Sequence, residues 1–106
     1  MHFIQRIKTK RKYGISCCDA SELQITLAKQ IVGGIQYLLD NQMGYPCEME
    51  SCEKWNEVLL KIQKGFKEWV LEGGYMKTDD IEFKAKEKEF NEATKLLGKH
   101  FLSLWN

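Results

Sequence analysis

Several features that would direct the interpretation of a small chain are scarce or missing in this sequence. Pro46 is the only proline among the 106 residues, and there is neither a low-complexity tract nor an internal repeat. No apolar run approaches the roughly 18 residues of a membrane-spanning helix, and charge interrupts the first residues too early for a secretory signal. These absences exclude membrane-spanning and repeat proteins, and we expect no membrane association and a cytoplasmic protein.

The length and composition that are present favour one folded domain. A chain of 106 residues is long enough for one domain and too short for two. Hydrophobic residues make up 43% of the sequence and aromatic residues 11%, which is enough apolar material for a packed core. We therefore expect a folded chain and no extended disorder.

The cysteines do not have the spacing of a metal site. They are Cys17, Cys18, Cys47 and Cys52, and thiols stay reduced in a cytoplasm. Zinc-binding cysteines are commonly two to four residues apart, and the helix expected between the two pairs separates them by about 30 Å. We predict no metal site within one chain and no cofactor, while a redox role or a metal site between subunits stays open.

Positive charge is concentrated at the N-terminus, although the whole chain has a net charge of +1. Residues 1–20 hold five basic residues and one acidic residue, residues 21–50 sum to −3, and residues 51–106 balance. The basic arm and its aromatic neighbour are Arg6, Lys8, Lys10, Arg11, Lys12 and Tyr13. Cations suit phosphates and aromatic rings stack on unpaired bases, so the arm is a candidate nucleic-acid- or nucleotide-binding segment. A solubilising or protein-docking terminus is the alternative.

Apolar residues at helical spacing predict three helices, over residues 21–42, 51–72 and 79–105. Ser51 is suited to cap the second helix, and Asp79 and its neighbours are suited to begin the third. Short loops between amphipathic helices indicate an all-α three-helix bundle over residues 20–106. The pattern of residues 1–19 suits an extended arm or a short hairpin.

Gly33 and Gly34 lie inside the first predicted helix, where each glycine costs about 1 kcal/mol relative to alanine. Close packing of another helix against this surface is the first explanation. A kink or a binding notch is the second. A phosphate-binding loop is excluded, because its glycines lie between a strand and the start of a helix.

The order of two turns and two helices resembles a known family. The pattern consists of Tyr13-Gly14-Ile15-Ser16, Asp19, an apolar helix, Gly44-Tyr45-Pro46, and then Trp55 with Leu59, Ile62 and Phe66. It resembles small proteins of tailed bacteriophages for which no activity is established, over roughly residues 13–70. The resemblance implies a phage product acting inside an infected bacterium and assigns no functional residues.

No arrangement of side chains in the sequence predicts catalysis. A reactive cysteine needs a base within reach, and acid–base hydrolysis needs carboxylates in an apolar pocket, whereas the acidic residues here alternate with lysines. Trp55, Trp69 and Trp105 fit the apolar helical stripes, while Tyr37 and Tyr45 lie where they can be exposed. We therefore expect a non-enzymatic protein-interaction module that binds a host or phage protein, with inhibition of a host factor or defence component as one version. Nucleic-acid or nucleotide binding by the basic arm is the alternative.

A sevenfold apolar repeat in the third predicted helix suggests self-association. The repeat and its neighbours are Phe83, Phe90, Leu97, Phe101, Leu104 and Trp105. Such a repeat is typical of a seam between helices of different chains, and closed two-fold symmetry is the commonest result. We predict a homodimer or a higher symmetric oligomer. The alternative is that the stripe packs within one chain.

Overall fold

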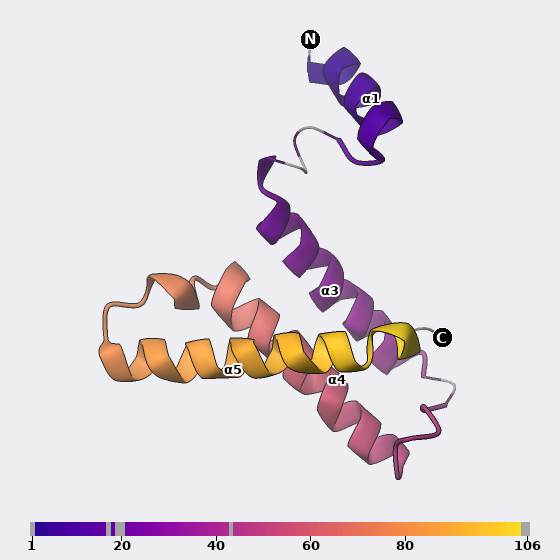
Figure 1. Cartoon of the computed structure of the whole chain (residues 1–106), viewed down its shortest axis with the longest axis vertical. Helices are drawn as coiled ribbons and strands as arrows, with labels where there is room; N and C mark the ends of the chain where they lie inside the picture. Colours follow the sequence, from indigo (N-terminus) through magenta and orange to yellow (C-terminus); the bar gives the residue numbers. More distant parts are fainter. Residues whose placement is uncertain (1, 17, 19–20, 43, 105–106) are drawn as a thin grey trace.

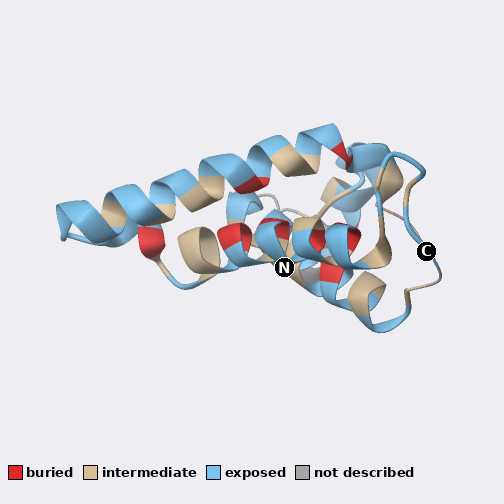
Figure 2. Cartoon of the chain, turned by 90° about the horizontal axis from the view of Figure 1, so that it is seen from below, coloured by how far each residue is buried: buried red, intermediate tan, exposed pale blue. Residues whose placement is uncertain are grey.

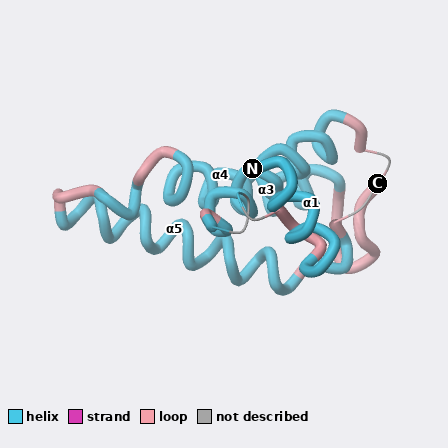
Figure 3. Tube along the Cα trace, turned by 90° about the horizontal axis from the view of Figure 1, so that it is seen from above, coloured by secondary structure: helices cyan, strands magenta, loops and turns pink. Residues whose placement is uncertain are grey.

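The computed structural model describes residues 2–16, 18, 21–42 and 44–104, and it is helical without a strand in these ranges (Figure 1, Figure 3). The α-helices given in these ranges are α1 (His2–Tyr13), α3 (Leu23–Asp40), α4 (Cys52–Phe66) and α5 (Asp80–Lys99). Three short elements complete the order: the π-helical η1 (Lys67–Leu71) and the 3-10 turns η2 (Gly74–Met76) and η3 (Phe101–Ser103). The predicted all-α class is confirmed.

The basic N-terminal segment is a helix, so the extended arm or short hairpin that we expected is wrong. Helix α1 has neither proline nor glycine, and its last turn holds Lys10, Arg11 and Lys12, whose charges suit the negative end of a helix dipole. It ends at Gly14, whose φ of 78° is the left-handed conformation that commonly follows a helix. The Gly14 N–H donates to the Lys10 carbonyl at 2.8 Å.

Helices α3 and α4 lie close to the predicted ranges and pack on one another. The Ser51 hydroxyl caps α4 by accepting a hydrogen bond from the Lys54 N–H at 3.2 Å, as predicted. The side-chain amide of Gln63 on α4 donates to the Val32 carbonyl of α3 at 3.0 Å and to Gln36 at 3.1 Å. These bonds reinforce an interface that is otherwise apolar.

The second helix is not α-helical to residue 72 as predicted, because its last turn widens into the π-helical η1. The Glu72 N–H donates to the Lys67 carbonyl five residues earlier, at 2.9 Å. Gly73, with φ 75°, then reverses the chain into η2. The wide turn directs Trp69 toward α5, where it meets two aromatic rings.

Helix α5 begins as predicted and ends earlier than predicted. The Asp79 carboxylate accepts from the N–H groups of Ile81 and Glu82 at 2.9 and 3.0 Å. The α-helix stops at Lys99 instead of continuing to residue 105, and η3 follows. The break allows His100 to be buried against Trp55, with ring centroids 5.4 Å apart, and Leu104 to pack on the core.

The buried core is small and centred on α4. Leu59 and Ile62 are its two fully buried large side chains, and both belong to α4. Buried segments make up only a small part of the ribbon in Figure 2. Helix α4 contacts α3 and α5, but no Cα atom of described α3 lies within 8 Å of a Cα atom of α5. The three predicted helices thus pack through α4, and the three-helix bundle that we expected is not confirmed in its details.

The chain is more extended than a compact domain of its length. Its radius of gyration is 16.3 Å, whereas about 13 Å is typical of 106 residues. Within the described chain, no Cα atom of α1 comes within 8 Å of a Cα atom of another helix, and α1 stands beyond the N-terminal end of α3 in Figure 1. Among the described helices, α1 therefore has no partner.

Candidate functional site

Helix α1 carries the residues predicted to bind nucleic acid, and it displays them on an isolated helix. Lys8, Lys10, Arg11, Lys12 and Tyr13 are exposed, whereas the side chain of Arg6 lies outside the described part. The Lys12 ammonium lies 5.2 Å from the centre of the Tyr13 ring. The five cations thus belong to one regular element with no acidic residue.

Helix α1 also has an apolar face. Ile4 is 59% exposed and Ile7 is 38% exposed. Residues three and four positions apart are neighbours on a helix surface, so Ile4 lies beside both Ile7 and Lys8, and Lys8 lies beside Lys12. The helix therefore combines exposed apolar groups with adjacent cations, a combination that suits an apolar surface bordered by carboxylates.

The glycine pair of α3 lies in the open and not under another helix. Neither Gly33 nor Gly34 has an atom within 4 Å of the position that a Cβ would occupy, so the close packing that we expected there is wrong. Helix α3 runs through both glycines as one continuous helix from Leu23 to Asp40. The pair leaves an exposed section of backbone without side chains.

The outward face of α3 exposes apolar groups on either side of this glycine pair. Leu23 and Leu27 are 44% and 45% exposed, and Tyr37 is 58% exposed. Leu23 and Leu27 are four residues apart, so they are neighbours on one side of the helix. The face is therefore an unpartnered apolar surface of the kind that is typical of association sites.

The predicted interface on α5 is largely occupied within the chain. Phe90 packs edge-to-face on Phe66 with ring centroids 5.1 Å apart and stacks on Trp69 at 5.8 Å. Phe83 lies 5.3 Å from Trp69. These contacts place the first half of the stripe against the chain's own aromatic side chains.

The residues in the second half of the predicted interface differ in how far they are buried. Leu97 and Leu104 are partly buried against the core, whereas Phe101 is 63% exposed on η3. Trp105 lies outside the described residues. Phe101 is therefore the only described member of the predicted interface set that is classed as exposed.

An open groove of about 360 Å³ lies between α4 and α5, beside the connector that precedes α4. Its apolar lining consists of Met49, Val58 and Leu96, which come from the connector, α4 and α5. A smaller hollow of about 190 Å³ continues from it along α4 and shares the lining residues Lys61 and Glu92. Together the two hollows follow α4 from Lys54 to Gly65.

The border of this groove is predominantly acidic. Its carboxylates are Glu48, Glu50, Glu57 and Glu92, against the two ammonium groups of Lys54 and Lys61. Among the described residues, Glu50, Glu57 and Glu92 take part in no ion pair within 4.0 Å. The groove therefore carries unneutralised negative charge above an apolar floor.

The acidic groove was not foreseen from the sequence. Glu57 and Glu92 are 35 positions apart and occur on helix faces where glutamate and lysine alternate. Such alternation is normal for solvated helices. Only the crossing of α4 and α5 brings the two carboxylates to one groove.

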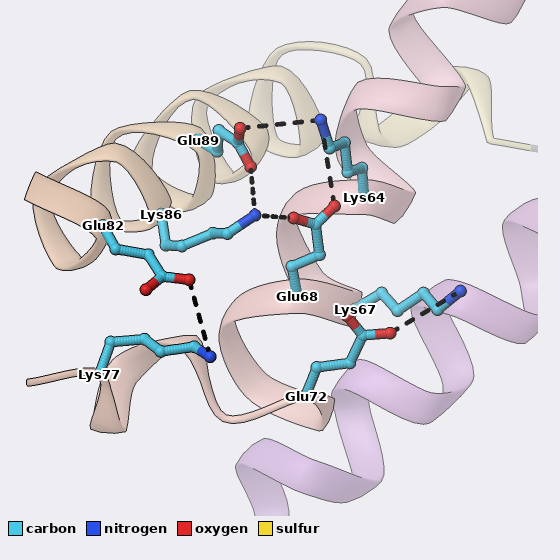
Figure 4. A network of polar contacts seen from close by, with 8 residues as sticks. All are labelled: Lys64, Lys67, Glu68, Glu72, Lys77, Glu82, Lys86 and Glu89. Atoms are coloured by element: carbon cyan, nitrogen blue, oxygen red, sulfur yellow. Dashed lines mark hydrogen bonds and ion pairs between the residues drawn. The ribbon is translucent and has the colours of Figure 1, made fainter. Parts of the chain in front are cut away.

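A network of charges joins α4, η1 and α5 and borders the smaller hollow, which its members Lys64 and Glu89 also line (Figure 4). The Lys86 ammonium of α5 donates to the Glu68 carboxylate, which also lies 4.0 Å from Lys64. Glu89 lies 3.9 Å from Lys86 and 3.7 Å from Lys64. The hydrogen bond with Glu68 is the main cause that raises the pKa of Lys86 above its ordinary value of 10.5. Because its charges are paired internally, this network stabilises the chain and offers little to a ligand.

Three of the four cysteines lie in the described part of the chain, and they differ in exposure. Cys18 and Cys47 are exposed, and the half-buried Cys52 thiol donates to the Gln42 side-chain carbonyl at 2.8 Å. Cys17 lies outside the described residues. No group of three or more His, Cys, Asp or Glu residues in the described ranges is arranged to hold a metal ion.

Comparison with models of known protein families, with curated proteins and with solved structures finds no match to this chain. Within the described residues, none of the helices combines the length and apolar character required to cross a membrane. The findings define an all-α chain with a small core, a detached basic helix and an acidic groove.

Proposed function

We propose that this chain is a non-enzymatic protein-interaction module that docks through the exposed face of α3, near Leu23 and Leu27. The observation that carries the proposal is the unpartnered apolar face of α3, on which Leu23 and Leu27 are 44% and 45% exposed. Helix α4 buries one side of α3 while both leucines stay almost half exposed. Burying a fully exposed leucine contributes about 1.5–3 kcal/mol, so covering the exposed part of each of these two side chains contributes about half of that and favours binding a protein.

The finer version of the proposal follows the resemblance to the phage family. The partner is a host or phage protein in the cytoplasm of an infected bacterium, and inhibition of a host factor or defence component is one outcome of that binding. Small size and an apolar docking face suit a protein that acts by covering a surface of its target.

A pull-down from infected cells followed by mass spectrometry tests this function. The full chain should retain a protein partner, and Leu23→Asp/Leu27→Asp should lose it because charge replaces the apolar contact. Leu102→Asp is the matched control, since Leu102 is 90% exposed on η3, outside the α3 face. The proposal is wrong if no protein is retained, or if the α3 variant and the control retain the same protein equally.

Nucleic-acid or nucleotide binding by α1 is the second candidate, and the acid-free row of cations on an exposed helix favours it. The major groove of DNA admits an α-helix, and phosphate contacts weaken steeply with salt. Fluorescence anisotropy of labelled DNA, RNA and cyclic nucleotides at rising salt tests it. Binding that is unchanged when Arg6, Lys8, Lys10, Arg11 and Lys12 are all replaced by serine would remove α1 as the site.

A further inference from the structure

We infer that helix α1 of one copy of this chain binds in the acidic groove between α4 and α5 of a second copy. The inference rests on the proposed function of protein interaction, and it names a second surface and its partner. It begins from the isolation of α1, which approaches no other described helix. A helix of about 12 residues is marginally stable in water by itself, so α1 needs an apolar partner surface to stay folded.

Charge complementarity selects the groove as that surface. Helix α1 contributes five cations and no acidic residue, and the groove border has four carboxylates against two lysines. The apolar parts match as well, since Ile4 and Ile7 are exposed on α1 and the groove floor contains Met49, Val58 and Leu96. An apolar helix face lying in a groove while its basic residues meet acidic rims is a common mode of helix recognition.

The dimensions also agree. The 12 residues of α1 span about 18 Å at 1.5 Å per residue. The two hollows follow α4 from Lys54 to Gly65, which is about 17 Å by the same rise. The whole helix can therefore lie along the groove without overhanging it.

A second copy is a better donor of this helix than the same chain. The groove begins beside the connector at the C-terminal end of α3, whereas α1 lies at the opposite end (Figure 1). The other end of the groove, at Gly65, lies nearer the middle of α3, since Gln63 bonds Val32 and Gln36 of that helix. No Cα atom of α1 comes within 8 Å of a Cα atom of another described helix, so the chain's own α1 leaves the groove open and a second copy can supply the helix.

Exchange of α1 between two copies gives a closed two-fold dimer in which each chain supplies one helix and one groove. In this dimer the apolar residues of α5, such as Phe90 and Leu97, keep their contacts within their own chain. Leu23 and Leu27 of α3 stay exposed and can bind another protein. Self-association is thus assigned to α1 and the groove.

Light scattering of the full chain at micromolar concentration tests the inference through charge reversal. The wild type should have about twice the chain mass of 12.4 kDa. Lys8→Glu/Lys12→Glu and Glu57→Lys/Glu92→Lys should each reduce the mass about twofold, to that of one chain, because like charges then meet in both contacts. Mixing the two variants should restore the doubled mass, since each reversed helix then meets a groove of opposite charge.

Two exposed lysines of α5 that do not line the groove provide the matched control. Lys84→Glu/Lys88→Glu makes the same change in net charge as the α1 variant and should leave the doubled mass unchanged. Circular dichroism should show that the variants retain α3, α4 and α5, and the restored mass in the mixture provides a second proof of folding.

Three results would overturn the inference. They are a wild type with the mass of one chain, a doubled mass that either reversal leaves intact, and a mixture that stays at one chain mass. None of them bears on the α3 face, whose partner is tested by Leu23→Asp/Leu27→Asp. Salt-dependent nucleic-acid binding by a wild type with the mass of one chain would assign α1 to nucleic acid instead.

Discussion

Gly65 of α4 lies directly against Ala93 of α5 at the point where the two helices cross. A methyl group on Gly65 would overlap the Ala93 side chain and would lie 3.0 Å from the Glu89 carbonyl oxygen. Gly65→Ala should therefore lower the free energy of unfolding by about 1–3 kcal/mol, as overpacking typically does, despite the better helix propensity of alanine. Urea unfolding followed by circular dichroism measures the change.

Gly98→Ala is the control for this substitution, because Gly98 lies in the same helix as Ala93 with no atom within 4 Å of its Cβ position. It should stabilise the chain by about 0.5–1 kcal/mol through propensity alone. Equal effects of the two substitutions would mean that α4 and α5 do not cross closely at Gly65.

Gly33→Ala and Gly34→Ala should each stabilise α3 by about 0.5–1 kcal/mol, since both positions are helical and open. Thermal unfolding of the two variants is the measurement. A loss of stability in either variant would show that something packs on this surface and would restore the explanation of close packing.

Stability should depend on pH through Lys86. Its pKa is raised above 10.5 chiefly by the hydrogen bond to Glu68, with Glu89 and Glu82 adding to the shift. The ion pair therefore stabilises the chain fully below the unfolded-state pKa and loses this contribution as the pH rises through the folded-state pKa. Urea unfolding at rising pH should show a steeper loss for the wild type than for Lys86→Met above pH 10.5.

Lys84→Met is the reference for other alkaline titrations, because Lys84 is exposed on the same helix and takes part in no described ion pair. Its stability curve should run parallel to that of the wild type. If the stability curve of Lys86→Met also runs parallel to that of the wild type, the ion pair with Glu68 does not contribute to the loss of stability at alkaline pH.

His100 should contribute to stability through the packing of its ring and not through hydrogen bonds. The residue is 3% exposed and packs edge-on against Trp55, and its Nδ1 has no hydrogen-bond partner and lies 3.9 Å from the Glu48 carboxylate. His100→Ala should destabilise the chain by about 2–4 kcal/mol by opening a cavity. His100→Phe should leave stability unchanged or higher, because it removes a buried polar atom that lacks a partner. A large loss in His100→Phe, measured by urea unfolding, would contradict this.

Helices α3, α4 and α5 were predictable because each one follows a local rule. Leu59 and Ile62 repeat at helical spacing, and Ser51 and Asp79 are residues that cap helices. Helix α1 was missed because its apolar face is short, with Ile4 and Ile7 as its described members, and basic residues fill most of the rest. Its signal is the run without glycine or proline that ends in three basic residues before Gly14.

The packing and the groove were beyond prediction from local patterns. Gly65 looks like any other glycine in the sequence, and only its contact with Ala93 28 positions later distinguishes it from Gly33. The same crossing brings Glu57 and Glu92 to one rim. Side-chain exposure on α5 was misjudged for a related reason, because Trp69 of η1 packs on Phe83 and Phe90, which lie 14 and 21 positions later in the sequence.

The central position of α4 has a consequence for how the chain loses its structure. No Cα atom of described α3 lies within 8 Å of a Cα atom of α5, and both helices pack on α4 and η1. Either helix can therefore detach while the other keeps its contacts with α4 and η1. Native-state hydrogen exchange should then separate the amides of α3 and α5 into different opening units, with the slowest exchange around Leu59 and Ile62. A partner that clamps α3 would slow exchange in that unit first and would leave α5 to open on its own.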